Sequence, residues 1–241
     1  MTWDEVGSSI ADGAVAILPI GAAAKQHGFH LPMQTDLIQA EVLAADLADH
    51  LDALIWPTVS YGHYPAFTDY AGSCSLSAAT FEAMVREIVD ALLRHGCRRV
   101  VVLNTGLSTI APIDRAVADH PDRVLHLKVY DGPRYLAQQR TLVRQSFGSH
   151  ADQIETAIML VLAPEVVVMS HAERSPAEVD GPLTPRDPDA RNYSRSGSYG
   201  DPTLATAEDG ARLLAAIRAD NLAAVTAFCT PPDRPADRVS P

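Results

Sequence analysis

Two histidines and one aspartate lie within ten residues of one another in the stretch KQHGFHLPMQTD. Imidazole nitrogens and carboxylate oxygens are the groups that bind zinc and similar divalent ions in proteins. His27, His30 and Asp36 could therefore belong to a metal site. The two residues before them suit such a site less, because the ammonium of Lys25 cannot coordinate an ion and Gln26 carries no charge. A structural interpretation stands beside this one: histidines in a glycine-containing turn often only hydrogen-bond the turn, and the aspartate could cap a following helix.

A second group of ionisable side chains occurs in the stretch GSHADQIE. His150 and Glu155 could complete a metal site or transfer protons in acid–base catalysis. Asp152 and Glu155 would share one face of a helix. The alternative is an ordinary helix start, with Ser149 as the N-cap and Asp152 at the third helical position, where acidic residues are favoured.

Hydrogen-bond donors and aromatic residues form a third set of candidates. In NTGLST, the side chains of Asn104, Thr105 and Ser108 could hold an anion or a carbonyl group, although a strand-to-helix turn with Asn and Ser caps would use the same residues. In YGHY, Tyr61 and His63 could line the wall of the same pocket. An aromatic side chain is more often part of the packing than a ligand contact.

The elements that must position these residues follow from hydrophobic periodicity. Short apolar runs predict buried strands at 14–21, 53–59, 97–106 and 123–130. Helical spacing predicts helices at 36–50, 77–95 and 111–119, in a segment that ends at Pro164, and from about 206 to 228. This alternation predicts an α/β fold with a mostly parallel sheet covered on both faces. Ligands in such folds bind beyond the carboxyl ends of the strands, where the three segments that follow strands, GAAAKQHGFH, SYGHYPAFTDYAGS and NTGLST, should meet.

The chain is expected to form one domain over residues 1–230, with a long irregular excursion at 172–207 and a flexible tail at 231–241. Ser77 is the expected N-cap of the helix at 77–95, and Gly96 its stop.

Charge and composition narrow the class of protein. The net charge of -11 argues against a nucleic-acid partner, since such proteins usually carry a basic face. The three cysteines are odd in number and widely spaced, which favours a reducing compartment over a disulfide framework. No apolar stretch approaches the length of a membrane span. We therefore expect a soluble, cytoplasmic protein with no membrane partner.

Five blocks in the same order resemble the creatininase (creatinine amidohydrolase) family. They are LPIGAAAKQHGFHLPMQTD, YGHYPAFTDYAGSCSLS, VVLNTGLST, GSHADQIETAIMLVLAPEVV and YGDPTLATAEDG, and they run from about residue 14 to 217. The resemblance implies a three-layer α/β/α sandwich, a homo-oligomer that is often a hexamer, and a centre of two zinc or manganese ions. It also implies hydrolysis of cyclic amides, formamides or related C–N bonds of small-molecule substrates.

The family's ligands carry over only in part. The resemblance implies a metal-binding role for His27 and Asp36, a substrate-side role for His150, a conserved role for Glu155 and a substrate contact at Ser73. Three other ligand positions hold residues that bind no divalent ion well: Lys25 replaces a Glu, Gly106 replaces a His, and Ser108 replaces a second ligand. A two-metal centre needs about four to six N or O ligands, so the chain resembles a divergent branch with an altered metal site.

One branch of the family looks closer to this chain, because it shares the Lys and the NTG turn. It carries glutamates where this chain has Gln26 and Gln153, so here the shape of the site is kept while its charge is reduced. We hypothesise that the ammonium of Lys25 supplies part of the positive charge of the missing metal. A Lys25 side chain that points into bulk solvent would refute this idea.

The function expected from these features is amide hydrolysis of a small polar substrate, possible with one divalent metal (Zn or Mn) on His27 and Asp36. His150 or Glu155 would complete the metal site or move the proton, and Lys25 would join them as the third catalytic residue. The expected substrate contacts are His30, Tyr61, His63, Ser73, Asn104, Thr105 and Ser108. The alternatives are a metal-independent biosynthetic enzyme (cyclisation, isomerisation or elimination) that uses His, Glu and Lys, or a non-catalytic pseudoenzyme. A separation of more than about 10 Å between His27, Asp36 and Glu155 would defeat the catalytic interpretations.

Overall fold

Four parallel strands form the centre of the computed structural model, which describes residues 1–175 and 181–230. The strands are β1 (Val15–Ile20), β2 (Ala53–Ile55), β3 (Val100–Asn104) and β4 (Val124–Lys128), and their order in the sheet is β2-β1-β3-β4. From β1 the chain continues to β2 on one side, and then crosses over to β3 and β4 on the other side of β1. The carboxyl ends of β1 and β3 therefore mark the usual ligand-binding crevice of an open α/β sheet.

Alternate residues of the strands face two separate cores. Val15 and Ile17 of β1 pack with the helices α2 (Thr35–Ala48) and α7 (Ala207–Cys229). Ala16, Leu18 and Ile20 instead pack with α3 (Ala78–Arg94) and α4 (Ile110–Val117). Every residue of β1 and β3 is buried, because helices cover both faces of the sheet. This is the arrangement of a parallel sheet between two helical layers.

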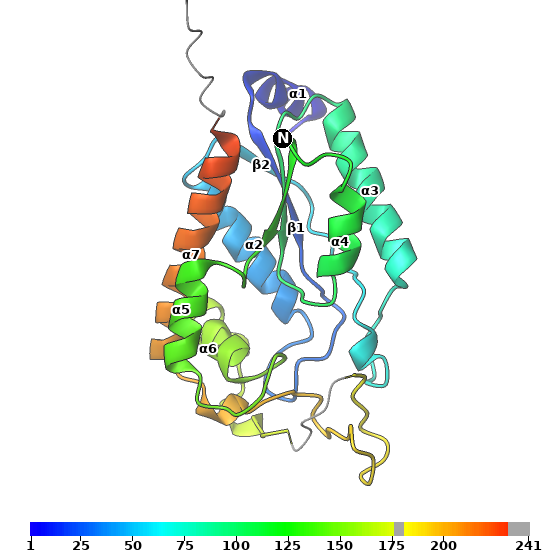
Figure 1. Cartoon of the computed structure of the whole chain (residues 1–241), viewed down its shortest axis with the longest axis vertical. Coiled ribbons are helices and arrows are strands. Elements are labelled where there is room, and N and C mark those ends of the chain that lie inside the picture. The colour runs from blue at the N-terminus through cyan, green and yellow to red at the C-terminus, as the bar shows by residue number, and fades with distance from the viewer. Residues whose placement is uncertain (176–180, 231–241) are drawn as a thin grey trace, which may run out of the picture.

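The helices are arranged in two layers with one helix at the end of the sheet (Figure 1). One layer holds α2 (Thr35–Ala48), α5 (Pro133–Leu142), α6 (Gln153–Leu162) and α7 (Ala207–Cys229), and the other holds α3 (Ala78–Arg94) and α4 (Ile110–Val117). Helix α1 (Trp3–Asp12) lies at the far end from the carboxyl ends of the strands (Figure 1). The expected three-layer α/β/α sandwich with a mostly parallel sheet is confirmed.

Several local expectations are confirmed as well, and others were wrong. Ser77 caps α3, and Gly96 follows the helix at a left-handed φ of 99°. Strand β2 is shorter than expected because Pro57 cannot donate a ladder hydrogen bond, and pairing resumes only as a single bridge between Ile20 and Val59. Helix α6 begins at Gln153 with Asp152 as its N-cap, so the expectation of Ser149 as N-cap was wrong.

Helices α1 and α5 were not expected from the sequence. A capping box begins α1. The backbone N–H of Glu5 donates to the side-chain oxygen of Thr2, and the backbone N–H of Thr2 donates to the carboxylate of Glu5. Pro133 occupies the first position of α5, where its missing N–H costs nothing.

Residues 172–175 and 181–207 form the irregular excursion in the described part of the chain, and its ordered contacts lead to the site. Tyr199 of the excursion pairs with His150 through backbone hydrogen bonds. Among the described residues of the excursion, the only helical element is a 3₁₀ turn at Pro202–Leu204. The expected flexible tail at 231–241 lies outside the described residues. A search of the described helices for one both long and apolar enough to cross a membrane finds none.

Candidate functional site

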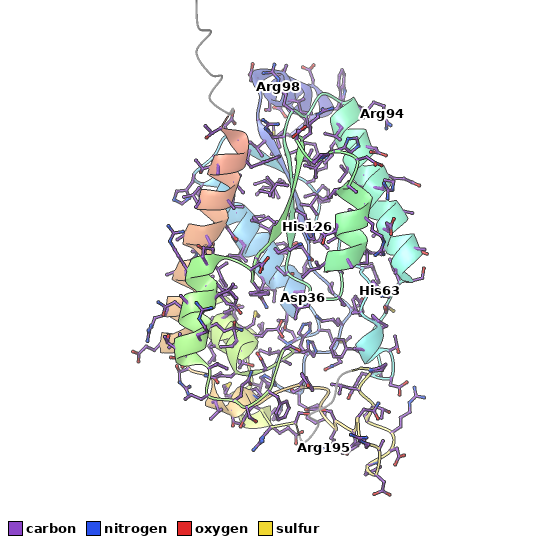
Figure 2. The ribbon with its side chains drawn as sticks, viewed as in Figure 1. Asp36, His63, Arg94, Arg98, His126 and Arg195 are labelled. Carbon is purple, nitrogen blue, oxygen red and sulfur yellow. The ribbon has the colours of Figure 1, made fainter. Side chains whose placement is uncertain are left out.

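Lys25, His27 and Asp36 form a contiguous buried cluster beside the carboxyl end of β1. Lys25 Nζ lies 2.7 Å from Asp36 Oδ2, and His27 Nε2 lies 3.1 Å from Asp36 Oδ1. Lys25 is only 7 % exposed, and His27 and Asp36 are buried. Asp36 belongs to the first turn of α2. Figure 2 shows Asp36 near the carboxyl ends of the strands. The Lys25 side chain therefore points into the site, as the sequence-based hypothesis requires.

His150 and Glu155 reach the same place from α6 and the loop before it. His27 Nε2 lies 3.7 Å from Glu155 Oε1, and His150 Nδ1 lies 3.8 Å from Glu155 Oε2. The two imidazole rings lie 4.6 Å apart between centroids. His27, Asp36 and Glu155 are therefore far closer than the 10 Å limit, and the geometric condition for catalysis is met.

The backbone carbonyl groups near the two histidines indicate which ring nitrogen of each carries the N–H. His27 Nδ1 lies 2.9 Å from the carbonyl oxygen of Lys25, and His150 Nε2 lies 2.8 Å from that of Gln26. A carbonyl oxygen only accepts, so these nitrogens are assigned as the N–H donors. The other nitrogens, His27 Nε2 and His150 Nδ1, both face Glu155. Two consecutive carbonyl groups thus orient these two ring nitrogens, in the way that carbonyl groups orient the histidines that bind metal ions in other proteins.

Electrostatics fix the charges of the cluster. Burial opposes ionisation of Asp36, but Lys25 and His27 together hold the pKa of this carboxyl below its usual range. Burial, with Lys25 and His27 nearby, lowers the pKa of His150 well below its usual value, so the ring is neutral. Burial raises the pKa of Asp152 to about 6, although this residue accepts two backbone hydrogen bonds as the cap of α6.

The donor set fits one divalent ion. The ligand atoms of His27, His150 and Glu155 all lie within 4.8 Å of one another. Two imidazoles and one carboxylate are a usual ligand set for zinc, with a fourth position left for water or substrate. Asp36 was also expected to be a ligand, but both of its oxygens already contact Lys25 and His27. A role for Asp36 in metal binding stays a prediction.

The cluster borders a cavity of about 510 Å³. Its wall includes, besides Lys25, Asp36, His150 and Glu155, several aromatic and apolar side chains: Phe67, Leu107, Tyr130, Tyr135, Val143 and Phe147. The ring of Phe67 lies against that of His150, with 4.0 Å between centroids. A second, much smaller cavity of about 10 Å³ lies on the other side of Lys25 and Asp36.

The expected substrate contacts fall in three places. Thr105 and Ser108 border the large cavity, and Tyr61, Asn104 and Ser108 border the small one. Three others lie elsewhere, and substrate contact by any of them stays a prediction. His30 is buried against Thr156, His63 Nδ1 contacts the carbonyl oxygen of Leu76, and Ser73 Oγ accepts from the backbone N–H of Gln26.

Gln26 has a positional role that the sequence did not indicate. Its amide nitrogen donates to the carbonyl oxygen of Gly197, at 2.8 Å, and its amide oxygen accepts from the backbone N–H of Gly28, at 2.9 Å. A carboxylate could not make the first of these hydrogen bonds. The hydrogen bond to Gly197 therefore connects the loop after β1 to the irregular excursion, next to His150.

Sequence reasoning also missed the aromatic wall and one strained residue. Phe67 lay within a block that was recognised, whereas Tyr130 and Tyr135 carried no signal because no pattern joined them to the other site residues. Ala151 has a positive φ of 45°, and its backbone N–H donates to Glu155 Oε2 at 2.6 Å. An alanine gives no sequence signal for a positive φ, a conformation that glycine and asparagine adopt far more readily.

Comparisons with known proteins identify the family of this chain. The family model described as creatinine amidohydrolase matches residues 1–225. The creatinine amidohydrolase of Pseudomonas putida is 26% identical over 234 residues, with 89% of this chain and 90% of that protein covered. The mycofactocin precursor peptide peptidase of Mycobacterium tuberculosis (strain CDC 1551 / Oshkosh) is 29% identical over 234 residues, with 90% and 86% covered.

Solved structures give the same result. A crystal structure of creatinine amidohydrolase matches with a TM-score of 0.80 and 26% identity, covering 96% of this chain and 97% of that one. A structure titled as the manganese form of creatininase matches with the same TM-score, identity and coverage. A mutant creatininase of Zn-Zn type matches with a TM-score of 0.79 and 27% identity, again covering 96% and 97%. The match of the family model over residues 1–225, together with the fold, shows that this chain belongs to the creatininase family.

Proposed function

We propose that this protein hydrolyses a C–N amide bond of a small polar substrate. The observation that carries the proposal is the convergence of two oriented imidazole nitrogens on Glu155 at the wall of a cavity of about 510 Å³. The relatives named as an amidohydrolase and a peptidase both act on C–N bonds, which supports the same class of reaction here.

A divalent ion, zinc or manganese, fits the residues of the site. His27 and His150 would hold it, and Glu155, whose carboxylate faces both rings, would either complete the site or move the proton. When bound, such an ion polarises a carbonyl group and lowers the pKa of a bound water to about 7. The manganese and Zn-Zn forms of creatininase support this choice of metal.

The chain's own residues supply the remaining steps. The cavity wall beside Phe67 and Tyr135 holds the substrate and excludes water from its apolar part. Glu155 faces both imidazoles and is partly exposed to the cavity, so it takes the proton of the attacking water and passes it to the leaving nitrogen. The backbone N–H of Ala151 keeps this carboxylate in place.

The test combines metal analysis with a panel of amides. Protein purified without chelator or histidine tag is analysed for zinc and manganese, and release of amine is measured for creatinine, formamides and short peptides. We expect bound metal and turnover of at least one amide. Glu155→Gln and His150→Ala are each expected to lose turnover, with Lys128→Met, at a partly exposed residue outside the cavity wall, as control. Folded protein without turnover of any amide on the panel would contradict the proposal.

A second candidate is a metal-independent acid–base enzyme, for ring closure, isomerisation or elimination in a biosynthetic pathway. The direct chain of contacts from Lys25 through Asp36 to His27 favours it, because these charges are balanced without an ion. Turnover that persists after complete removal of metal by a chelator would select this candidate. A pseudoenzyme would instead bind a ligand and show no turnover in either state.

We also infer a cytoplasmic homo-oligomer. The three free cysteines support a reducing compartment, and the family resemblance supports assembly. Light scattering coupled to size-exclusion chromatography measures the number of subunits.

A further inference from the structure

Lys25 is an unusual cation in this protein. The chain has two lysines, Lys25 and Lys128, and its other cationic side chains that are always charged are arginines. Lys128 lies partly exposed beside Asp114, whereas Lys25 is buried next to Asp36 at 2.7 Å. A positive charge buried this deeply is retained only where a partner or a function holds it.

The ammonium of Lys25 keeps donors that the described part of the chain does not use. An ammonium carries three N–H donors, and Asp36 Oδ2 is the one oxygen that contacts Nζ among the described residues. The centroid of the Phe67 ring lies 5.6 Å from Nζ. Because Lys25 borders both cavities, an oxygen atom of a bound molecule is the natural acceptor for the remaining donors.

The surroundings of this ammonium do not suit a second divalent ion. The small cavity beside Lys25 and Asp36 has about 10 Å³, which is enough for about one water molecule. Its other polar neighbours include Asn104, Gly106 and Ser108, and none of these is an imidazole or a carboxylate. A second dication here would also lie next to the ammonium, which would repel it.

We propose that Lys25 takes the place of a second metal ion: the centre binds one divalent ion, and the Lys25 ammonium binds the acyl oxygen of the substrate. This inference rests on the proposed function for its substrate, but its metal stoichiometry is independent of it. Water attacks the acyl carbon, the carbonyl electron pair moves to the oxygen, and Lys25 donates a hydrogen bond to the developing negative charge. The C–N bond then breaks, the carbonyl re-forms, and the nitrogen leaves with the proton taken from water.

The first test measures how many ions the centre binds. Metal-free protein is titrated with Mn²⁺, and bound metal is followed by electron paramagnetic resonance and elemental analysis. We expect one Mn²⁺ per chain with the spectrum of an isolated ion. Lys25→Glu adds a carboxylate and frees Asp36, so this variant should bind a second ion and give a spin-coupled spectrum. Two ions in the unchanged protein, or none, would overturn the proposal.

The second test measures the contact with the substrate. Lys25→Met should keep one bound Mn²⁺ and lower kcat by about 10²–10³, with KM little changed, because the hydrogen bond strengthens only as charge develops on the oxygen. Lys25→Arg should recover part of the loss, and Lys128→Met is the matched control. If Lys25→Met does not fold, Lys25→Met with Asp36→Asn removes both charges together.

Undiminished kcat in these Lys25 variants would overturn the role in substrate binding and leave the proposed function intact. Absence of hydrolysis in the unchanged protein, with one Mn²⁺ bound, would contradict the proposed function instead. In that case a selectively ¹⁵N-labelled lysine spectrum, with only two signals, shows whether acetamide shifts the Lys25 signal. An unshifted Lys25 signal would overturn the substrate contact.

Discussion

The backbone N–H of Ala151 donates a hydrogen bond of 2.6 Å to the Glu155 carboxylate four residues later. Ala151 reaches this position only with a left-handed φ of 45°, which costs a non-glycine residue of the order of 1 kcal/mol or more. The strained turn separates His150 from the N-cap Asp152, so it determines where both His150 and Glu155 lie.

Ala151→Val should destabilise the protein by about 2–3 kcal/mol, because a β-branched residue tolerates a left-handed backbone poorly and the site is fully buried. Ala151→Gly should change the free energy of unfolding by less than about 1 kcal/mol, since glycine accepts this conformation. Chemical denaturation measures both. Equal losses for the two variants would show that the positive φ is not what limits this position.

Gln26→Glu should destabilise the protein by about 1–3 kcal/mol, although the two residues have nearly the same shape. The change removes the donor to the Gly197 carbonyl oxygen and places a carboxylate in a buried position. Thermal unfolding at neutral pH measures the loss. A variant as stable as the unchanged protein would mean that the hydrogen bond from Gln26 to the Gly197 carbonyl oxygen does not contribute to stability.

Asp36→Asn should cost about 3 kcal/mol or more, because it leaves the Lys25 ammonium buried without its partner. The double change Asp36→Asn with Lys25→Met should recover a large part of this loss. A double-mutant cycle of unfolding free energies gives the coupling between the two residues. Additive losses would mean that the two charges do not depend on each other.

Acid should destabilise the protein through His30. Burial, with His27 nearby, lowers the pKa of His30 from 6.5 to about 4. Between these values the unfolded chain binds the proton and the folded chain does not, so stability is complete above pH 6.5 and is lost as the pH falls towards 4. The full effect is on the order of 3 kcal/mol.

His30→Gln should therefore flatten the profile of unfolding free energy between pH 6.5 and 4, with the exposed His50→Gln as control. Profiles of equal slope in the His30 variant and the unchanged protein would contradict this assignment.

The fold could be predicted from the sequence because hydrophobic periodicity and strand boundaries are local signals. The blocks around His27 and His150 also indicated that the loop after β1 and the start of α6 meet. The orientation of the imidazoles could not be predicted, since it depends on the carbonyl groups of Lys25 and Gln26 and not on any side chain type. Tyr130 and Tyr135 were missed for a similar reason: Tyr130 lies in the turn after β4 and Tyr135 in α5, which packs against α7, so only the tertiary structure brings them to one cavity.

Gly210→Ala should destabilise the protein by several kcal/mol, because α7 crosses α6 very closely at this residue. A Cβ atom on Gly210 would lie 1.8 Å from the carbonyl oxygen of Ala157, a backbone atom that cannot move without moving α6. The contrasting control is Gly7→Ala in the exposed face of α1, where nothing lies within 4 Å of the added atom. That change should stabilise the protein by about 0.5–1 kcal/mol, since alanine has the higher helix propensity. Because α6 carries Glu155, surviving Gly210→Ala protein should also show weaker metal binding, whereas Gly7→Ala should not; unchanged stability and metal affinity in Gly210→Ala would show that the two helices can separate without disturbing the site.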